Sequence, residues 1–299
     1  MTTVGLIGLG AMGSGMAASL RRAGHNVQVF DVRREVAEAF THAGGTAHDT
    51  LASLGAACDV VVSVVVNAAQ TEAVLFGDGS TPGCAASMKP GSVFVMCSTV
   101  DPNWSVALES RLEAMGLRYV DAPISGGAAK AASGQMTMMT AGTPEAYAVA
   151  EPFLNAMAAK VYKLGDSAGA GSKVKIINQL LAGVHIAAAA EAMALGLREG
   201  VDPAALYEVI TNSAGNSWMF ENRMAHVLAA DYTPLSAVDI FVKDLGIVLD
   251  MARASKFPLP LSSTAHQMFM QASTAGFAKE DDSAVIKIFP GIELPKGKA

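Results

Sequence analysis

The sequence contains few cysteines, few aromatic residues and few charges. The three cysteines, Cys58, Cys84 and Cys97, cannot all pair and lack the spacing of metal ligands, so we expect free thiols, a reducing compartment and no metal site. Charged residues make up 16% of the chain and the formal net charge is −6, which argues against a general binder of nucleic acid or anionic membranes. We therefore expect a cytoplasmic protein whose partner is a small molecule.

Internal repeats and long linkers are also lacking, and we expect no signal peptide. The N-terminus has no basic segment of the kind that begins a signal peptide. The apolar run around Ala187 is interrupted by His185 and Glu191, which places it below the criterion for a membrane span. What the chain does have is 51% hydrophobic residues over 299 positions, enough for about two domains with substantial cores.

A glycine-rich turn near the N-terminus stands in the full context of a dinucleotide-binding motif. An apolar strand, Val4 to Ile7, leads into the turn, and a segment of helical period and a second strand, Val27 to Phe30, follow it. The first glycine of such a turn permits the tight bend, the second admits a pyrophosphate, and the third lets helix and strand pack closely. The turn residues predicted to meet the cofactor phosphates are Gly8, Gly10, Ala11, Met12 and Gly13.

Asp31 ends the second strand, where a carboxylate accepts hydrogen bonds from the ribose hydroxyls of a bound adenosine. The same charge would repel a 2′-phosphate, so the sequence favours NAD over NADP. Arg33 and Arg34 complicate this prediction. They form either the solvated first turn of the next helix or a partial site for the extra phosphate.

Two further apolar runs, Asp59 to Val66 and Ser92 to Met96, predict buried parallel strands. Asn67 and Thr99 follow these strands at the carboxyl edge, where open α/β sheets bind ligands. Each of the two is either a cofactor neighbour or a helix cap. The alternation of strand and helix patterns predicts a Rossmann domain over residues 1–165, with a doubly wound, mostly parallel sheet.

A second glycine-rich segment runs from Asp121 to Gly127, after a strand that begins at Tyr119. Successive backbone N–H groups in such a segment form an anion-binding concavity suited to a carboxylate. The alternative is a simple turn without a ligand.

A long helix is predicted from Ser172 to Glu199, roughly 40 Å at about 1.5 Å per residue. It would open an all-α domain over residues 166–299. Lys175, Asn178 and Gln179 lie on one face of it, among apolar neighbours. The lysine is therefore either a surface residue whose aliphatic stem is buried or a residue that takes part in catalysis.

Four stretches together resemble the β-hydroxyacid dehydrogenase family, and the likeness covers nearly the whole chain. They are Gly8 to Gly13, Asp121 to Gly127, Gly169 to Asn178, and Lys243 to Gly246. The resemblance implies a cleft between a Rossmann domain and an all-α domain, with Lys175 as the catalytic lysine and Asn178 beside it. It also implies that Ser125, Gly126 and Gly127 hold the substrate carboxylate and that Thr99 and Lys243 lie near a nicotinamide cofactor.

Many relatives carry a Leu-Pro pair after the strand that here ends in Val65, Val66 and Asn67, and many have a second asparagine where this chain has Gln179. Both departures bear on the details of the pocket. Further runs of sequence resemble one branch of the family that oxidises a four-carbon sugar acid. Asn216 would then bind a distal hydroxyl, or it belongs to a purely structural corner. The expected reaction passes hydride from a secondary alcohol to NAD while Lys175 takes the hydroxyl proton.

An imine reductase is disfavoured, since that branch of the family typically has another residue where Lys175 stands. Three further alternatives remain open at this stage. Two are other activities of the family, tartronate semialdehyde reductase and 3-hydroxyisobutyrate dehydrogenase. The third is a non-catalytic nucleotide-binding scaffold, which the presence of Lys175 disfavours. Long apolar helices in the second domain favour a homodimer or homotetramer.

Overall fold

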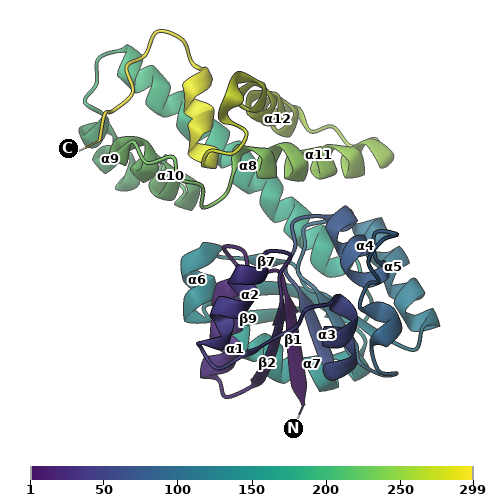
Figure 1. Ribbon diagram of the computed structural model, residues 1–299. Coiled ribbons are helices and arrows are strands. Elements are labelled where there is room, and N and C mark those ends of the chain that lie inside the picture. Colours follow the sequence, from purple (N-terminus) through teal and green to yellow (C-terminus); the bar gives the residue numbers. More distant parts are fainter. Residues whose placement is uncertain (1, 298–299) are drawn as a thin grey trace. The chain divides into compact units, whose positions relative to one another are not determined.

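The computed structural model describes residues 2–297, and the chain divides into two compact units, Met1–Lys175 and Ile176–Ala299. The first unit is an α/β structure and the second is helical, as the sequence predicted (Figure 1). The division falls within helix α8 (Ala170–Arg198), whereas the sequence argument placed the domain boundary before this helix, at residue 165.

The first unit is built on a nine-stranded sheet in the order β3-β2-β1-β4-β5-β6-β8-β7, with β9 paired to β8. The pairs from β3 through β6 are all parallel, and β8 runs antiparallel to β6 and β7. This is the doubly wound order of a Rossmann fold. The strands are β1 (Thr3–Ile7), β2 (Asn26–Phe30), β3 (Thr46–Ala47), β4 (Val60–Ser63), β5 (Val93–Met96), β6 (Arg118–Asp121), β7 (Ile124–Ser125), β8 (Met136–Gly142) and β9 (Ala158–Lys163).

The central strands are buried on both faces, which explains their continuous β-branched runs. In β4, Val60 and Val62 join one hydrophobic cluster and Val61 joins the other, and all three are fully buried. The predicted strand extended to Val66, but β4 ends at Ser63, and residues 64–67 form the loop that leads to α4.

Helices cover the sheet, and several begin at side-chain caps that the sequence supplies. Thr50, Asn67, Asp101 and Thr143 each accept a hydrogen bond from a backbone N–H in the first turn of the helix they precede. The helices are α1 (Gly13–Arg22), α2 (Arg34–Thr41), α3 (Leu51–Ala57), α4 (Ala68–Phe76), α5 (Pro102–Ala114), α6 (Gly127–Ser133) and α7 (Pro144–Met157), with a 3-10 turn η1 (Ala85–Ser87).

The second unit packs its helices around the apolar face of α8. Ile186, Ala190 and Met193 of α8 share one cluster with Phe241 and Leu245 of α11. Helix α12 ends at Ala272 and leads into a π-helical turn, and a 3-10 helix follows from Asp282. The remaining elements are α9 (Pro203–Thr211), α10 (Trp218–Ala229), α11 (Val238–Ala254), α12 (Pro260–Ala272), η2 (Ser273–Phe277) and η3 (Asp282–Ile288).

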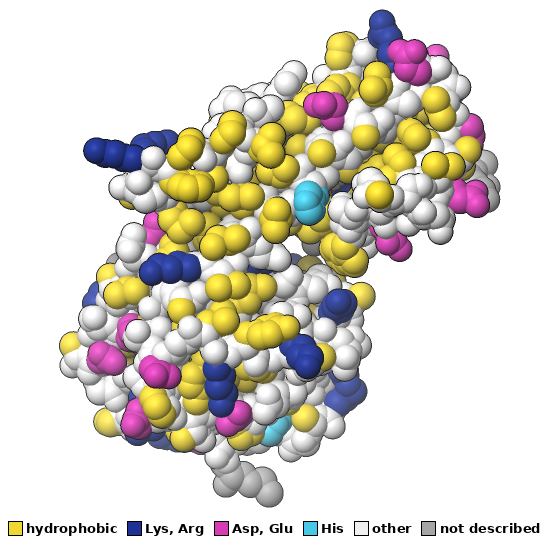
Figure 2. All heavy atoms as spheres, turned by 180° about the vertical axis from the view of Figure 1, so that it is seen from behind, with side chains coloured by type: hydrophobic (Ala, Val, Ile, Leu, Met, Phe, Trp, Pro, Cys, Tyr) yellow, Lys and Arg dark blue, Asp and Glu magenta, His cyan; other side chains and the backbone are white. Residues whose placement is uncertain are grey.

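Helix α8 is long and apolar enough to cross a membrane by length and composition, with a mean hydropathy of 1.7 over its best window. The expectation that His185 and Glu191 would place it below this criterion was wrong, because two polar residues lower the mean too little. Core helices of globular proteins share this length and apolar composition. Only 44% of that window is buried, and Figure 2 shows many hydrophobic side chains on one face of the helical unit.

Candidate active site

The glycine turn after β1 has three glycines that differ in what surrounds them. Gly8 has a φ of +92°, in the left-handed region that favours glycine. An added β-carbon on Gly13 would lie 1.8 Å from the carbonyl oxygen of Gly8, whereas one on Gly10 would meet no atom within 4 Å. The backbone at Gly10 is therefore open to a ligand, next to Ala11, Met12 and the first N–H groups of α1.

Asp31 lies beside this turn and is held by backbone donors. Its carboxylate accepts hydrogen bonds from the N–H of Leu9 at 2.6 Å and of Arg33 at 2.9 Å, and Arg33 Nε lies 3.3 Å away. Burial alone would raise the pKa of Asp31, but these donors outweigh it and hold the pKa below its ordinary value. The group is therefore a charged acceptor.

The two arginines after Asp31 have different partners. Arg33 pairs with Asp31 itself, while Arg34 begins α2 and pairs with Glu38 at 2.7 Å and Asp49 at 3.2 Å. Arg34 thus lies in the first turn of the helix, which is one of the two predicted alternatives, and its guanidinium forms ion pairs with two carboxylates.

A crevice of about 570 Å³ runs from the glycine turn past Asp31. Its walls include Val32, which is 90% exposed, and Val66, which is 48% exposed. Apolar walls suit the flat face of an adenine, and the open backbone at Gly10 suits a pyrophosphate. The residues present therefore fit a dinucleotide cofactor.

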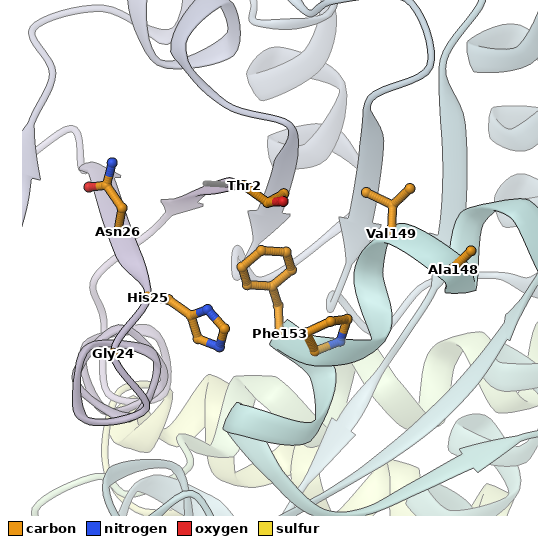
Figure 3. A pocket seen from close by; sticks show the side chains of 8 residues that line it. Thr2, Gly24, His25, Asn26, Ala148, Val149 and Phe153 are labelled. Atoms are coloured by element: carbon orange, nitrogen blue, oxygen red, sulfur yellow. The ribbon is translucent and has the colours of Figure 1, made fainter.

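A second depression, of about 380 Å³, lies at the opposite, amino-terminal edge of the sheet (Figure 3). There the ring of His25 packs against Phe153 with centroids 4.7 Å apart, and Thr2 and Asn26 add polar groups. None of the predicted site residues lines it.

The loops after β4 and β5 are tied together by a residue that the sequence analysis did not single out. The Ser98 hydroxyl donates to the carbonyl of Val65 at 2.8 Å and lies 3.1 Å from the hydroxyl of Thr71. Asn67 caps α4 by accepting from the N–H of Gln70 at 2.8 Å, and Thr99 is half-buried directly after Ser98. The cofactor roles of Asn67 and Thr99 stay predictions.

The segment Asp121–Gly127 is more ordered than a simple turn. It contains the short strand β7 and the start of helix α6, with Gly126 at φ +136° and Gly127 at φ +76°. The Asp121 carboxylate contacts the start of α8 and the residue before it. It accepts hydrogen bonds from the N–H groups of Gly169 and Ser172, both at 2.9 Å, and from the Ser172 hydroxyl at 2.7 Å. Asp121 thus caps the start of α8.

Lys175 lies in the second turn of α8 and is only 7% exposed. The burial argues against a surface lysine. Asn178, one turn further, donates from its amide to Gln179 Oε1 at 3.1 Å. Both predicted partners of the lysine therefore lie on the same helix, at the spacing that the sequence predicted.

In the helical unit, a buried polar chain continues from Gln179. Gln179 Nε2 donates to Asp244 Oδ2 at 2.6 Å, and the other oxygen of Asp244 forms an ion pair with Lys243. Asp244 is 1% exposed, so the carboxylate of the Lys243–Asp244 pair is buried. Asp244 lies in the Lys243–Gly246 stretch, yet its contact with α8 could not be inferred from spacing.

The corner before α10 uses its polar side chains locally. Asn216 donates to the carbonyl of Thr211 at 3.1 Å, and Ser217 caps α10 by accepting from Phe220 N–H at 3.0 Å. Asn216 Oδ1 is buried and has no hydrogen-bond partner among the described residues. Its proposed contact with a substrate hydroxyl stays a prediction.

Within residues 2–297, no three His, Cys, Asp or Glu side chains are grouped so that they could hold a metal ion. Cys58, Cys84 and Cys97 are free and buried. Burial raises the pKa of both Cys58 and Cys84 to about 12.

The sheet order, the open glycine turn and the carboxylate at the end of β2 define a nicotinamide-dinucleotide-dependent dehydrogenase. The chain belongs to the β-hydroxyacid dehydrogenase family, among the enzymes similar to 3-hydroxyisobutyrate dehydrogenase. Residues 3–165 match the NAD binding domain of 6-phosphogluconate dehydrogenase, and residues 169–289 match the NAD-binding domain of NADP-dependent 3-hydroxyisobutyrate dehydrogenase.

Individual relatives agree with this assignment. The chain is 69% identical over 296 residues to the L-threonate dehydrogenase of Cupriavidus necator, covering 99% of this chain and 98% of that protein. It is 32% identical to the mitochondrial 3-hydroxyisobutyrate dehydrogenase of Rattus norvegicus, over 96% and 86% of the two chains. The crystal structure of a 3-hydroxyisobutyrate dehydrogenase from Salmonella typhimurium superposes with a TM-score of 0.92 at 51% identity, covering 97% of this chain and 100% of that one. The chain is thus an oxidoreductase that acts on a hydroxy acid.

Proposed function

We propose that this enzyme oxidises the C2 hydroxyl of L-threonate to the 2-oxo acid, 2-oxo-tetronate, with NAD. The names of several relatives, among them the Cupriavidus necator protein, support the substrate. The observation that carries the chemistry is the burial of Lys175 beside Asn178 on α8.

Lys175 is the proposed general base. An amine accepts a proton only in its neutral form, and removal from water favours that form. Lys175 takes the proton of the C2 hydroxyl during oxidation and returns it during reduction. Asn178 orients the hydroxyl oxygen through its amide, and Gln179 contacts the substrate next to it.

Substrate orientation falls to the Ser125–Gly127 segment. Its backbone N–H groups hold the carboxylate of the acid, which fixes the position of C2. The bound nicotinamide cofactor supplies the hydride acceptor. Asn216 binds a distal hydroxyl of the substrate, and Thr99 and Lys243 contact the cofactor.

NAD is the proposed cofactor in preference to NADP. Asp31 is charged and accepts hydrogen bonds, so it suits the ribose hydroxyls and repels a 2′-phosphate. The pairing of Arg34 with Glu38 and Asp49 supports the same preference, because this guanidinium is already neutralised by two carboxylates.

The substrate is tested with a panel of L-threonate, D-threonate, the erythronates, glycerate and 3-hydroxyisobutyrate, with NADH absorbance as the measure. We expect kcat/KM to be highest for L-threonate by at least about tenfold, a difference of about 1.4 kcal/mol. A higher value for 3-hydroxyisobutyrate would support the second candidate activity, which the Salmonella typhimurium structure favours.

We also propose a cytoplasmic homodimer or homotetramer that associates through the outer face of α8. Ile177, Leu181 and Leu195 lie on this face and are 53%, 51% and 61% exposed. Large apolar side chains at such spacing on one helix typically mark a protein interface. Ala188, also exposed, lies between the two leucines and would let a partner helix approach closely.

Sedimentation velocity tests the interface. Leu181→Glu combined with Leu195→Glu should convert the oligomer to a smaller species, while Val209→Glu on α9, also at an exposed apolar residue, should not. A wild-type protein that sediments as a monomer at micromolar concentration would exclude the proposed assembly.

A further inference from the structure

Three residues of α8 form one face of the helix around the proposed base. Ser172 and Gln179 lie three residues before and four residues after Lys175, so their β-carbons are its neighbours at roughly 5–6 Å. The three side chains are 1%, 7% and 8% exposed in the order Ser172, Lys175, Gln179. The contacts that hold Ser172 and Gln179 therefore also limit the positions that the Lys175 side chain can take.

A buried carboxylate holds the first neighbour. Asp121, at the end of β6, is fully buried and receives three hydrogen bonds at the start of α8, one from the N–H of Gly169, the residue before the helix, and two from Ser172. The N–H groups of a first helical turn have no partner within the helix, so a carboxylate from another element caps them well. Glu109 extends this anchor by accepting from Ala168 N–H at 3.0 and 3.1 Å.

A second buried carboxylate holds the other neighbour. Asp244 accepts from Gln179 Nε2 at 2.6 Å and also pairs with Lys243. The bond fixes the Gln179 amide so that its Oε1 faces the amide of Asn178. Asp244 thus orders two polar side chains on the turn that follows Lys175.

Other buried carboxylates are used differently. Asp282 pairs with Arg223 on α10, and Asp281 binds His226 on the same helix. These contacts stabilise the helical unit without reaching the turns beside Lys175. Asp121 and Asp244 are set apart because each binds a residue that shares a helix face with the lysine.

We propose that Asp121 and Asp244 are positioning residues for the reaction, which fix Ser172 and Gln179 and so set the direction of the Lys175 side chain. The inference rests on the proposed role of Lys175. A displacement of about 1 Å at a reacting group can cost about a hundredfold in rate. The loss of either anchor therefore lowers kcat even at temperatures where the variant is folded.

Asp121→Asn tests the first anchor. A carboxamide has one acceptor oxygen and turns an N–H group toward donors, so it cannot receive the same three bonds. We expect kcat to fall at least tenfold while the Kd of NADH stays within twofold. Ser172→Ala removes only the hydroxyl bond and should give an intermediate kcat. Tyr147→Phe is the matched control, because it deletes a buried 2.7 Å hydrogen bond to Thr140 in the same unit.

Asp244→Leu and Asp244→Asn test the second anchor. Leucine removes the acceptor for Gln179 and should lower kcat at least tenfold, whereas asparagine keeps an acceptor oxygen and should recover most of the rate. Asp282→Asn is the control, since it removes a buried charge from the same unit away from α8. We expect both controls to lower the melting temperature and to keep kcat within twofold at temperatures where they are folded.

Either of two results would overturn the inference: a kcat within twofold of wild type in both Asp121→Asn and Asp244→Leu, or no recovery in Asp244→Asn. Amide hydrogen exchange tests the anchor without using activity, so it separates a failure of this inference from a failure of the proposed function. Asp121→Asn should speed exchange over residues 169–176 at least tenfold, and Tyr147→Phe should not. If the wild-type enzyme oxidises no acid of the panel, the proposed function fails, and unchanged exchange in Asp121→Asn would separately exclude the anchor.

Discussion

The carbonyl oxygen of Gly8 lies 1.8 Å from the point that a β-carbon on Gly13 would occupy. No such conflict exists at Gly10, where an added β-carbon has no atom within 4 Å. The turn therefore needs its glycines for two separable reasons: Gly13 serves the packing of the fold, and Gly10 serves the approach of the ligand.

Gly10→Ala and Gly13→Ala should separate these two requirements. Gly10→Ala should leave the melting temperature within about 2 °C, since a surface change costs less than about 0.5 kcal/mol, yet weaken NADH binding at least tenfold. Gly13→Ala should destabilise the protein by about 1–3 kcal/mol through overpacking. Differential scanning fluorimetry and NADH fluorescence titration measure the two quantities. A Gly10→Ala protein that binds NADH normally would show that the phosphates do not pass this backbone.

Substitution of Asp31 by alanine should lower the preference for NAD over NADP, because the charge that repels a 2′-phosphate is removed. We expect the ratio of the two kcat/KM values to fall at least tenfold, with Glu145→Gln, at an exposed carboxylate in the first turn of α7, as the control. An unchanged ratio would place the discriminating group elsewhere.

The same carboxylate predicts how NAD binding depends on pH. The pKa of Asp31 lies below its ordinary value in the folded protein, so its charge is present at all pH values above that and is lost only as the pH falls through it. The KM for NAD should therefore stay constant from about pH 9 to about pH 5 as far as this group is concerned. A rise in KM between pH 7 and pH 5 that disappears in Asp31→Ala would contradict the assignment.

The cysteines should be unreactive in the native protein. Cys58, Cys84 and Cys97 are buried, and a pKa of about 12 keeps Cys58 and Cys84 in the thiol form at neutral pH. Ellman's reagent at pH 8 should modify none of them within minutes, and all three after denaturation. Rapid reaction of one thiol in the native protein would mean that its surroundings open readily.

Long periodic segments made the fold predictable. The β-branched run at Val60–Val62 predicted a central strand, and the proline-free segment after Ser172 predicted α8, because burial on a sheet or along a helix imposes a pattern on many residues at once. Short helices such as α3 and α6, of seven residues each, were missed because so few residues carry too little periodicity.

The site was predictable in part. The glycine turn, Asp31 and the Lys175–Asn178–Gln179 face follow from local spacing and from family resemblance. The anchors Asp121 and Asp244 do not, because each contacts a residue of α8 that is 51 or 65 positions away in the sequence. Side-chain contacts at such separations depend on the tertiary fold and leave no periodic trace in one sequence.

Replacement of Lys175 by methionine tests the central claim most directly. General acid–base catalysis contributes about 10²–10⁴-fold, so oxidation of L-threonate by NAD at pH 8 should slow by at least about a hundredfold. The Kd of NADH should stay within twofold, because the glycine turn and Asp31 are untouched. A Lys175→Met enzyme that keeps most of the wild-type kcat would contradict the account.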